Sequence, residues 1–545
     1  MAKSQPKVVE AEYVVVGAGS AGCAVAGRLA DAGHSVVLLE AGGPDKSLMF
    51  KRPGMITMIH SEPKLKAKFD WGYYHAPSEH VNGRKLPATR GRVMGGSGSV
   101  NGMIFVRGHK ANFDSWEAEG NKGWGYDDVL KSYKSMEDWQ GAPSEYRGKN
   151  GPIKVLENPD ITDASKCFIE AGNNALGIGV NSDYNGATQE GMHVIQENTH
   201  AGQRFSSSHG YITAAHLPTL SVQTGGTVTK VVIDNGRATG VEVQDAKGMR
   251  RVVRATKEVI LSAGAFGSPQ ILMLSGVGPS GHLAQHGIQV VNDLPVGDNL
   301  HDHMFVPLTY AVDNSPNKST PFYFGAGIIK DRLKPGRTFM AHSVFEAGGF
   351  THTSLSQSAA PDMQLFAIPW SYPPFQDEPV RLSPDKRPSL SVFSTLVQPR
   401  SRGTLRLSSP DPLAAPIIDP QFLAEPDDLK VILEGVDMIR SIMADPAIAK
   451  HVQEEYEPGS RFTGTQLRAE VLKRVTTVYH PVGSCRMGVD ERAVVDPSLR
   501  VNGIEGLRVA DASIMPSIIS GNTNAPSMMI GERAAQIILG QVTIP

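Results

Sequence analysis

The stretch YVVVGAGSAGCAVAGRLADAGHSVVLLEAGG, residues 13–43, constrains the fold of this chain more than any other feature. Its apolar run before Gly17 is typical of a strand that is buried on both faces. Gly17, Gly19 and Gly22 form a GxGxxG pattern, in which the glycines allow a tight turn, a close backbone approach to a pyrophosphate and close packing of helix on strand. An alanine-rich helix and a second apolar strand ending at Glu40 complete a βαβ unit. The stretch therefore predicts a dinucleotide site, with the pyrophosphate at the helix N-terminus.

Glu40 stands where the second strand of such a unit ends. A carboxylate at this position can accept hydrogen bonds from ribose hydroxyls and would repel a 2′-phosphate. The residue therefore disfavours NADP but leaves NAD and FAD open, because those two share the same adenosine end.

Length and charge exclude several classes of protein. At 545 residues the chain can bury a large core, and a prior of about 150 residues per domain suggests about two to four domains. A net charge of -2, with no block rich in lysine or arginine, predicts no nucleic-acid partner. No apolar run reaches the roughly 18 residues of a membrane-spanning helix, so we expect no transmembrane segment. The polar first residues, and three cysteines without zinc or disulfide spacing, favour a cytoplasmic location.

A second glycine cluster, TRGRVMGGSGSVNGMIFVRG, spans residues 89–108. Apolar segments on both sides of its adjacent glycines, Gly95 and Gly96, predict that the loop is buried. Buried adjacent glycines usually mark a close approach of the backbone to another group. We interpret the cluster as a loop that lies against a planar ring or a second phosphate; a flexible surface turn is the alternative.

Three further stretches carry a resemblance to a known family. They read GAFGSPQILMLSGVGP (264–279), YHPVGSCRMG (479–488) and LRVADASIMPSIISGNTNAPSMMIGERAA (507–535). Together with the two glycine clusters, and in this order along the chain, they closely resemble the glucose-methanol-choline (GMC) oxidoreductase family of FAD enzymes. The segments TTVYHPVGSCRMG and QPRSRGTLRLSSPDP (398–412) are most similar to the bacterial alcohol dehydrogenases of that family.

The resemblance implies an α/β fold, α+β overall, with two domains that are each assembled from separate segments. A Rossmann-like FAD-binding domain would comprise residues 1–155, 220–310 and 476–545. A substrate domain, an antiparallel β-sheet flanked by helices, would comprise residues 156–219 and 311–475.

Local patterns agree with this expectation. Residues 219–265 show short β-branched runs divided by Asn-Gly and Lys-Gly turns, which predict β-hairpins. Residues 427–444 carry apolar side chains at helical spacing and predict an amphipathic helix. A final helix is expected from about Pro526. The proline-rich and aromatic stretch 365–380 resembles neither helix nor regular strand, and would either line a substrate entrance or pack as an ordered loop on the core.

Oxidation of an alcohol removes a proton from oxygen and a hydride from carbon, so the protein must supply a base and a polar group that holds the oxygen. The resemblance places the active-site histidine of the family at His480. Neutral imidazole suits the base, because its unperturbed pKa of about 6.5 lies near working pH. The second active-site position of the family, Asn or His, falls on Asn524, whose amide would hold the substrate oxygen towards His480.

The resemblance also implies the residues that bind FAD. Val100 stands where some relatives carry a histidine that tethers FAD, so the cofactor should be held without a covalent bond. The expected contacts run from the adenosine end to the ring and ribityl end: Gly17, Gly19, Ser20, Ala21, Gly22, Glu40, Ala41, Arg92, Met94, Gly95, Gly96, Ser97, Asn101, Gly102, Met103, Val228, Ala263, Asp511, Ala512, Asn522 and Thr523.

Other candidate sites have weaker support. His301 and His303 form an HxH pattern that hints at metal, but no third ligand is indicated, and we expect no metal site. Cys485 follows His480 closely, but a buried structural thiol is the better interpretation. No GxSxG pattern is present, so acyl hydrolysis has no support.

The predicted function is FAD-dependent oxidation of a primary alcohol to an aldehyde, with hydride transfer to flavin N5 and His480 as base. A quinone, a cytochrome or another acceptor would reoxidise the flavin. Alternatives are an oxygen-using alcohol oxidase of the same family, a flavin-containing lyase that acts on cyanohydrins, and a nucleotide-binding protein without catalysis. We expect the walls that select the substrate to come from residues about 310–400, and the sequence carries no code for the alcohol or for the oligomeric state.

Overall fold

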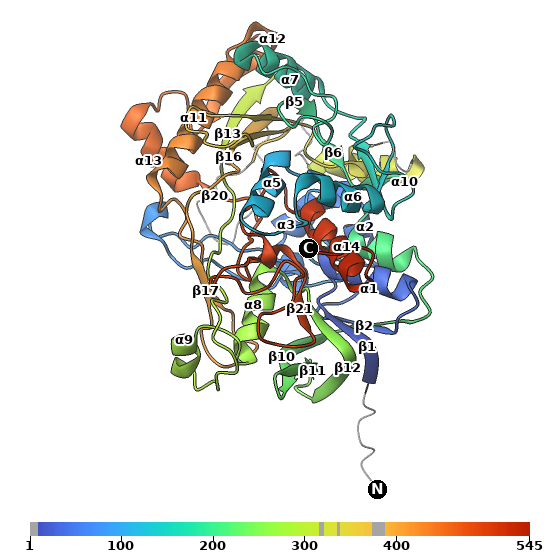
Figure 1. The fold of residues 1–545 in the computed structure, drawn as a ribbon. Helices are drawn as coiled ribbons and strands as arrows, with labels where there is room; N and C mark the ends of the chain where they lie inside the picture. The colour runs from blue at the N-terminus through green and yellow to red at the C-terminus, as the bar shows by residue number, and fades with distance from the viewer. Residues whose placement is uncertain (1–8, 316–320, 335–337, 373–386, 545) are drawn as a thin grey trace.

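The computed structural model describes residues 9–315, 321–334, 338–372 and 387–544 (Figure 1). Its two large β-sheets each contain seven strands. The mixed architecture confirms the predicted α/β fold class. No helix within the described residues is long and apolar enough to cross a membrane.

The first sheet is built around the βαβ unit predicted from the sequence. Strand β1 precedes the glycine-rich turn, helix α1 follows it, and β2 ends at Glu40, as expected. β1 pairs in parallel with β2 on one side and with β12 on the other, and β10 and β11 extend the sheet as antiparallel hairpins. In spatial order the strands are β10 (Gly226–Asp234), β11 (Arg237–Asp245), β12 (Arg250–Leu261), β1 (Val9–Val16), β2 (Val36–Glu40) and β9 (Leu220–Thr224), with β21 (Leu507–Val509) paired to β12.

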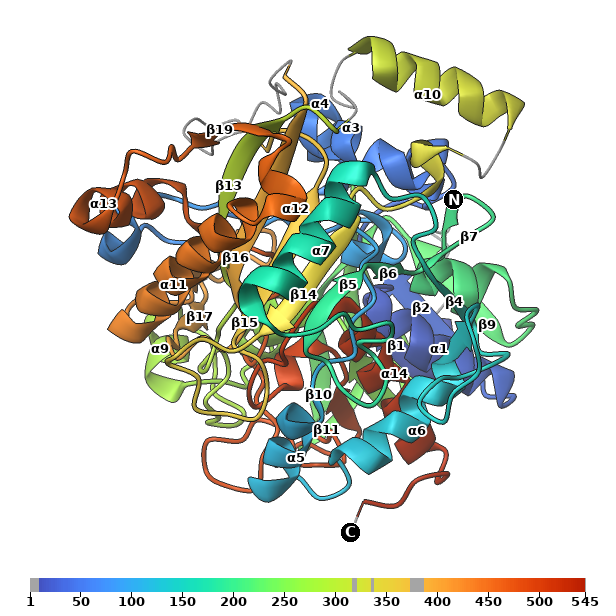
Figure 2. The same ribbon diagram turned by 90° about the horizontal axis from the view of Figure 1, so that it is seen from above.

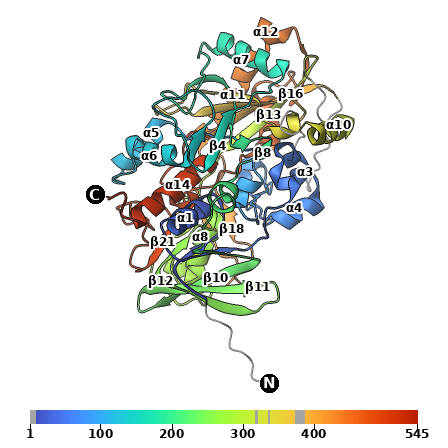
Figure 3. The same ribbon diagram turned by 90° about the vertical axis from the view of Figure 1, so that its right-hand side faces the viewer.

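Two helices from opposite ends of the chain pack side by side on this sheet. They are α1 (Ser20–Asp31) and α14 (Asn524–Ile538), and Figure 3 shows them together. A Cβ atom on Gly531 would lie 2.3 Å from the carbonyl oxygen of Ala21, so a side chain at this glycine would hold the two helices apart. Both helices begin at the same edge of the sheet, where the cavity described below opens.

The second sheet is antiparallel throughout, as predicted for the substrate domain. Helices α7 (Asp163–Leu176) and α11 (Pro426–Met443) cover one of its faces (Figure 2). In spatial order the strands are β19 (Val452–Glu457), β13 (Met304–Val312), β16 (Ser389–Leu396), β15 (Met363–Ile368), β14 (Ala347–Thr351) and β5 (Gly191–Val194), with β20 (Thr476–Thr477) paired to β13.

Side chains of the second sheet alternate between its two faces, as the pleat of a strand requires. On β15, Met363, Leu365 and Ala367 pack against the helices. Phe366 and Ile368 point to the opposite face, in a separate cluster. Both faces of this strand are buried, and the uncovered face forms one wall of the cavity.

Two expectations for local structure were wrong or imprecise. The stretch 365–380 was expected to contain no regular strand, but its first residues belong to β15, because burial on both faces removes the polar alternation by which strands are recognised. Residues 373–380 of that stretch lie outside the described residues. The final helix begins at Asn524 rather than near Pro526, and Pro526 occupies its first turn, where a missing N–H costs nothing.

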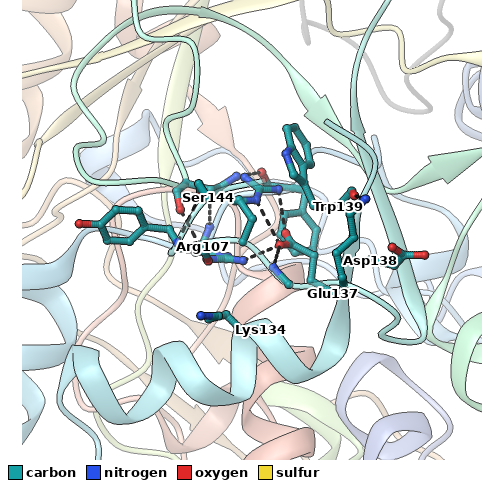
Figure 4. A network of polar contacts seen from close by, with 12 residues as sticks. Arg107, Lys134, Glu137, Asp138, Trp139 and Ser144 are labelled. Carbon is teal, nitrogen blue, oxygen red and sulfur yellow. Dashed lines mark hydrogen bonds and ion pairs between the residues drawn. The ribbon is translucent and has the colours of Figure 1, made fainter. Parts of the chain in front are cut away.

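A buried network of charges surrounds Arg107, near the end of the second glycine cluster (Figure 4). Glu137, the first residue of β3 (Glu137–Trp139), accepts hydrogen bonds from Arg107 Nη2 at 2.7 Å and from Arg147 Nη2 at 2.8 Å. The Arg147 guanidinium also stacks over the Trp139 ring at 3.7 Å and bonds to Asp183 at 2.8 Å. These contacts hold the strand-like segment before Arg107 in a single position.

The other elements are shorter or peripheral. The strand β13 crosses the expected segment boundary at residue 310, and the division of the chain into two domains stays a prediction. The remaining helices and strands are α2 (Leu48–Lys51), α3 (Ile56–Ser61), α4 (Pro63–Phe69), α5 (Lys110–Ala118), α6 (Tyr126–Met136), α8 (Gly264–Leu274), α9 (Ser280–Gln285), α10 (Pro321–Leu333), α12 (Pro446–Ala449), α13 (Gly464–Arg474), β4 (Ile153–Glu157), β6 (Gln196–Glu197), β7 (Thr199–His200), β8 (Gln203–Arg204), β17 (Thr404–Arg406) and β18 (Ile417–Asp419).

Candidate active site

A cavity of about 940 Å³ is lined by residues of both large sheets. The size lies at the upper end of the range for cofactor and ligand sites. At one end lie the turn after β1 and the end of β2, and at the other lie the face of the second sheet and the segment around His480. The cavity therefore joins the predicted nucleotide site to the predicted base.

The glycine-rich turn after β1 has the shape that a dinucleotide requires. Gly17 has φ of +96°, and a Cβ on Gly22 would lie 1.9 Å from the carbonyl oxygen of Gly17. A Cβ on Gly19, by contrast, would meet no atom within 4 Å and would project into the cavity. This open cradle beside Gly19 fits a pyrophosphate that lies close against the backbone.

Glu40 lines the same end of the cavity and is held by backbone amides. The amide of Ala18 donates to its Oε2 at 3.0 Å, and the amide of Gly42 donates to its Oε1 at 2.8 Å. Burial raises the pKa of Glu40 to about 7, against the lowering effect of these two hydrogen bonds. A carboxyl group fixed in this way can receive ribose hydroxyls on its remaining lone pairs, as the sequence predicted.

Two helix N-termini meet at the middle of the cavity. Ser20 begins α1, Asn524 begins α14, and Ser20 Oγ donates to Asn524 Oδ1 at 2.6 Å. The positive ends of two helix dipoles favour an anion at this point. Together with the cradle at Gly19, the donor groups here fit the pyrophosphate of FAD.

The second glycine cluster packs against the first. The amide of Gly95 donates to the carbonyl of Ala18 at 2.7 Å, and a Cβ on Gly96 would lie 2.8 Å from the Cα of Gly19. The interpretation of the cluster as a buried loop is therefore confirmed. Val100 lines the cavity, and its carbonyl oxygen accepts a hydrogen bond from His60 Nε2 at 2.8 Å.

Most of the residues expected to bind FAD line the cavity. The exceptions are Gly22, Met94 and Gly95, which form the layer behind the wall and support the two turns. The residues on the wall are Gly17, Gly19, Ser20, Ala21, Glu40, Ala41, Arg92, Gly96, Ser97, Asn101, Gly102, Met103, Val228, Ala263, Asp511, Ala512, Asn522 and Thr523.

The tautomer of His480 follows from its hydrogen bonds. His303 Nε2 lies 3.1 Å from the carbonyl oxygen of Val397, which can only accept, so this nitrogen carries the proton. Burial lowers the pKa of His303 to about 3, so the ring is neutral and its Nδ1 is an acceptor. His480 Nδ1 lies 3.0 Å from that atom and must donate to it. In neutral His480 the acceptor lone pair is therefore on Nε2.

His480 is kept neutral by its surroundings. Burial lowers its pKa well below the ordinary value, and the nearby His303 and the positive charge of Arg90 lower it further. The backbone amide of His480 donates to Asp302 Oδ1 at 2.7 Å, which fixes the position of the residue. The site thus presents an unprotonated imidazole nitrogen to the cavity at neutral pH.

The amide that contacts His480 in this structure is that of Asn522. Asn522 Nδ2 lies 3.3 Å from His480 Nε2, and Asn522 Oδ1 accepts a hydrogen bond from Gln364 Nε2 at 3.3 Å. Asn524 is instead bonded to Ser20 at the junction of the two helices. Asn524 lines the same cavity, and its expected role as partner of His480 stays a prediction. The helix begins between the two residues and turns their side chains in different directions.

His301 and His303 form hydrogen bonds within the protein, and Cys485 is buried. The amide of Ile518 donates to His301 Nε2 at 3.0 Å, His301 Nδ1 lies 2.6 Å from the carbonyl of Asn299, and His303 bonds to His480 as described. Cys485 is buried, and burial raises the pKa of its thiol, which fits the predicted structural role.

Comparison with known proteins gives a consistent result. Models of the N-terminal and C-terminal parts of the GMC oxidoreductases match residues 11–305 and 399–531. An alcohol dehydrogenase [acceptor] of Pseudomonas putida is 38% identical over 541 residues, which cover 97% of this chain and 96% of that protein. An oxygen-dependent choline dehydrogenase of Sinorhizobium medicae is 38% identical over 549 residues, covering 98% and 96%.

Solved structures of related enzymes share the whole fold. Pyridoxine 4-oxidase from Mesorbium loti superposes with a TM-score of 0.86 at 27% identity, covering 98% of this chain and 100% of that one. A variant of formate oxidase from Aspergillus oryzae gives a TM-score of 0.88 at 26% identity, covering 98% of each chain.

Proposed function

The chain belongs to the GMC oxidoreductase family and is an FAD-dependent oxidoreductase that acts on CH–OH groups. From this premise we propose that it oxidises a primary alcohol to an aldehyde, with His480 as base and Asn522 as the group that holds the substrate oxygen. The observation that carries the proposal is the acceptor nitrogen Nε2 of His480, which contacts the Asn522 amide within the cavity that also contains the dinucleotide turn.

Bound FAD supplies an acceptor for the hydride that leaves the alcohol carbon. Val100 has no atom that could tether the flavin ring, which supports a cofactor held without a covalent bond. The wall residues Asn101, Gly102 and Met103 are positioned to lie beside the ring.

The two polar side chains have complementary tasks. An alcohol hydroxyl placed between them would donate its proton to His480 Nε2 and accept a hydrogen bond from Asn522 Nδ2. Gln364 holds Asn522 Oδ1, so the Nδ2 group is the one directed at the substrate. Once protonated, His480 can still donate through Nδ1 to His303, which disperses the new charge. A positioned base of this kind typically accelerates a reaction by a factor of about 10²–10⁴.

Reoxidation of the flavin is the second half of the proposed reaction. A quinone, cytochrome or similar acceptor is supported by the relative named alcohol dehydrogenase [acceptor]. Oxygen is the second candidate, supported by the structural neighbours named as oxidases. We also propose a cytoplasmic location, which the small number of cysteines, all unpaired, supports.

Anaerobic mixing of the FAD-loaded protein with a panel of primary alcohols tests the proposal. We expect loss of the visible flavin absorbance with at least one alcohol and formation of the matching aldehyde. Recovery of colour on adding a quinone, or on admitting air, then identifies the acceptor. The His480→Ala variant should keep bound FAD, because His480 lies at the substrate end, and should lose reduction by about 10²–10⁴-fold. Unimpaired reduction in this variant would remove His480 from the mechanism.

A further inference from the structure

The face of the second sheet that lines the cavity is aromatic. Phe305 on β13, Phe366 on β15 and Phe393 on β16 lie on this face, and Phe345 and Tyr372 lie beside them. Pairing of the strands explains the grouping, since Phe366 lies directly opposite Phe393 in the register of β15 and β16. We call these five rings, Phe305, Phe345, Phe366, Tyr372 and Phe393, the aromatic wall.

The rings of the aromatic wall contact one another in the arrangements that aromatic pairs prefer. Phe393 is the central ring: it stacks on Phe305 with centroids 4.6 Å apart, and it meets Tyr372 edge to face at 5.0 Å. Phe345 meets Phe366 edge to face at 5.5 Å. The wall is thus a continuous aromatic surface and not a set of isolated side chains.

The aromatic wall lies next to the proposed base. β20 pairs with β13 so that Thr476 lies opposite Phe305, and the chain continues from β20 to His480. The amide of Val478 donates to the carbonyl of His303 at 3.1 Å, which holds this connection against the start of β13. A substrate whose hydroxyl reaches His480 must therefore place its carbon skeleton against the wall.

The charges around this end of the cavity disfavour a cationic substrate. Among the described residues that line the cavity, the acidic ones are Glu40 and Asp511, and both accept hydrogen bonds from backbone amides away from the wall. Near His480 the charged residue that lines the cavity is the cation Arg90, whose guanidinium bonds to the carbonyl of Tyr479; Asp302 accepts from the backbone amide of His480 but does not line the cavity. A second cation beside Arg90 would be repelled in this poorly solvated site.

We propose that the substrates of this enzyme are neutral alcohols whose carbinol carbon is attached to an aromatic ring, and that the aromatic wall selects them. The inference rests on the proposed function, because the hydroxyl is positioned by His480 and Asn522. Stacked and edge-to-face contacts with a substrate ring add to the attraction that burial of any apolar group would give.

Binding of inert analogues tests the wall separately from the chemistry. Benzamide and cyclohexanecarboxamide carry the same polar head, but only the first has an aromatic ring, and neither can be oxidised as an alcohol. Apolar burial alone favours the saturated ring, which has more hydrogen-bearing surface. We expect benzamide to bind the FAD-loaded protein about threefold to tenfold more tightly, measured by calorimetry and by perturbation of the flavin spectrum. Equal binding, or preference for the saturated ring, would overturn the proposal.

Variants of the wall have a matched control in the same cluster. In Phe305→Leu and Phe393→Leu, benzamide should bind at most about twofold more tightly than cyclohexanecarboxamide, because each substitution removes one ring from the wall. Phe350 on β14 belongs to the same hydrophobic cluster and is fully buried, but it does not line the cavity and stacks instead on His193. Phe350→Leu should cost similar stability and leave the preference unchanged. A loss of preference in all three variants would show a general effect of destabilisation and contradict the assignment.

Reduction of the flavin by different alcohols distinguishes a wrong substrate class from a wrong proposed function. Benzyl alcohol, cyclohexylmethanol and choline, mixed anaerobically with the FAD-loaded protein, should reduce the flavin in that order of kcat/KM, with choline at least about a hundredfold below benzyl alcohol. Comparable reduction by choline would overturn the substrate class while leaving alcohol oxidation intact. Absence of reduction by every alcohol, with the benzamide preference retained, would remove the proposed function and leave the aromatic site standing.

Discussion

The Glu137 network and the His480 site both bury polar side chains, but they do so in opposite ways. Glu137 is an ionisable group shared by two guanidinium groups, and its oxygens also accept from the backbone amide of Gly148. His480 contacts a neutral imidazole and a carboxamide, and within the described part of the chain no carboxylate is hydrogen-bonded to its ring. The charged groups of the first region lie away from the cavity, whereas His480 and Asn522 both line it, so that a substrate can reach them. Buried polar side chains are candidates for catalysis where they line a cavity that a ligand can enter.

The largest expected effect comes from Glu137→Gln. Removing the carboxylate leaves Arg107 and Arg147 in the core with less compensation, and breaking a buried ion pair in this way costs about 3–5 kcal/mol. The midpoint of denaturant unfolding of the FAD-loaded protein should fall accordingly, while the rate of flavin reduction per folded molecule should change by less than about twofold. The control is Asp138→Asn, because its pair with Lys154 is partly exposed and such pairs contribute about 1 kcal/mol or less. Equal stability of the two variants would contradict the structural role of the network.

A smaller effect, on rate and not on stability, distinguishes the two asparagines of the GNTN segment. Asn522→Leu should lower the rate of flavin reduction by about 10²-fold, the usual effect of removing one donor to a reacting oxygen. Asn524→Leu should leave that rate within about threefold and weaken FAD retention by about fivefold, since it removes one hydrogen bond near the helix N-termini. Stopped-flow reduction and titration of the apoprotein with FAD measure the two quantities. The opposite pattern would support the assignment made from the sequence alone.

The same two asparagines show what sequence reasoning could and could not determine. A βαβ unit is encoded within about 30 consecutive residues, so its strands, its helix and Glu40 were all predicted in place. His480 was found because it lies within a long family motif. Asn524 was assigned because it falls on the second active-site position of the family, whereas in the structure Asn522 makes the hydrogen bond to His480. A motif aligns positions along the chain, but it does not record which of two neighbouring side chains makes a given hydrogen bond.

Features built from distant residues were not predictable in the same way. The aromatic wall joins rings at positions 305, 345, 366, 372 and 393, and only the register of three strands brings them together. The prediction that residues 310–400 would form the substrate walls included four of these rings but missed Phe305, which lies before that range. Glu137 received no role from the sequence, because its partners come from two other segments.

The smallest expected effect is on pH dependence, and it tests whether His480 is neutral for the reason given. Burial, His303 and Arg90 all lower its pKa, so the active, unprotonated form is present at every pH above that lowered value. The groups facing the ring or its backbone are His303, Asp302, Arg90 and Asn522, and burial raises the pKa of Asp302 to about 6. An unperturbed histidine would lose most of its base form between about pH 7 and pH 6. The rate of flavin reduction should instead stay nearly constant from pH 8 to about pH 6.5 and decline only in more acidic solution, with circular dichroism confirming that the fold persists. A decline that is already half complete at pH 7 would mean that His480 is solvated or paired with a carboxylate, and the contrast with the Glu137 network would then disappear.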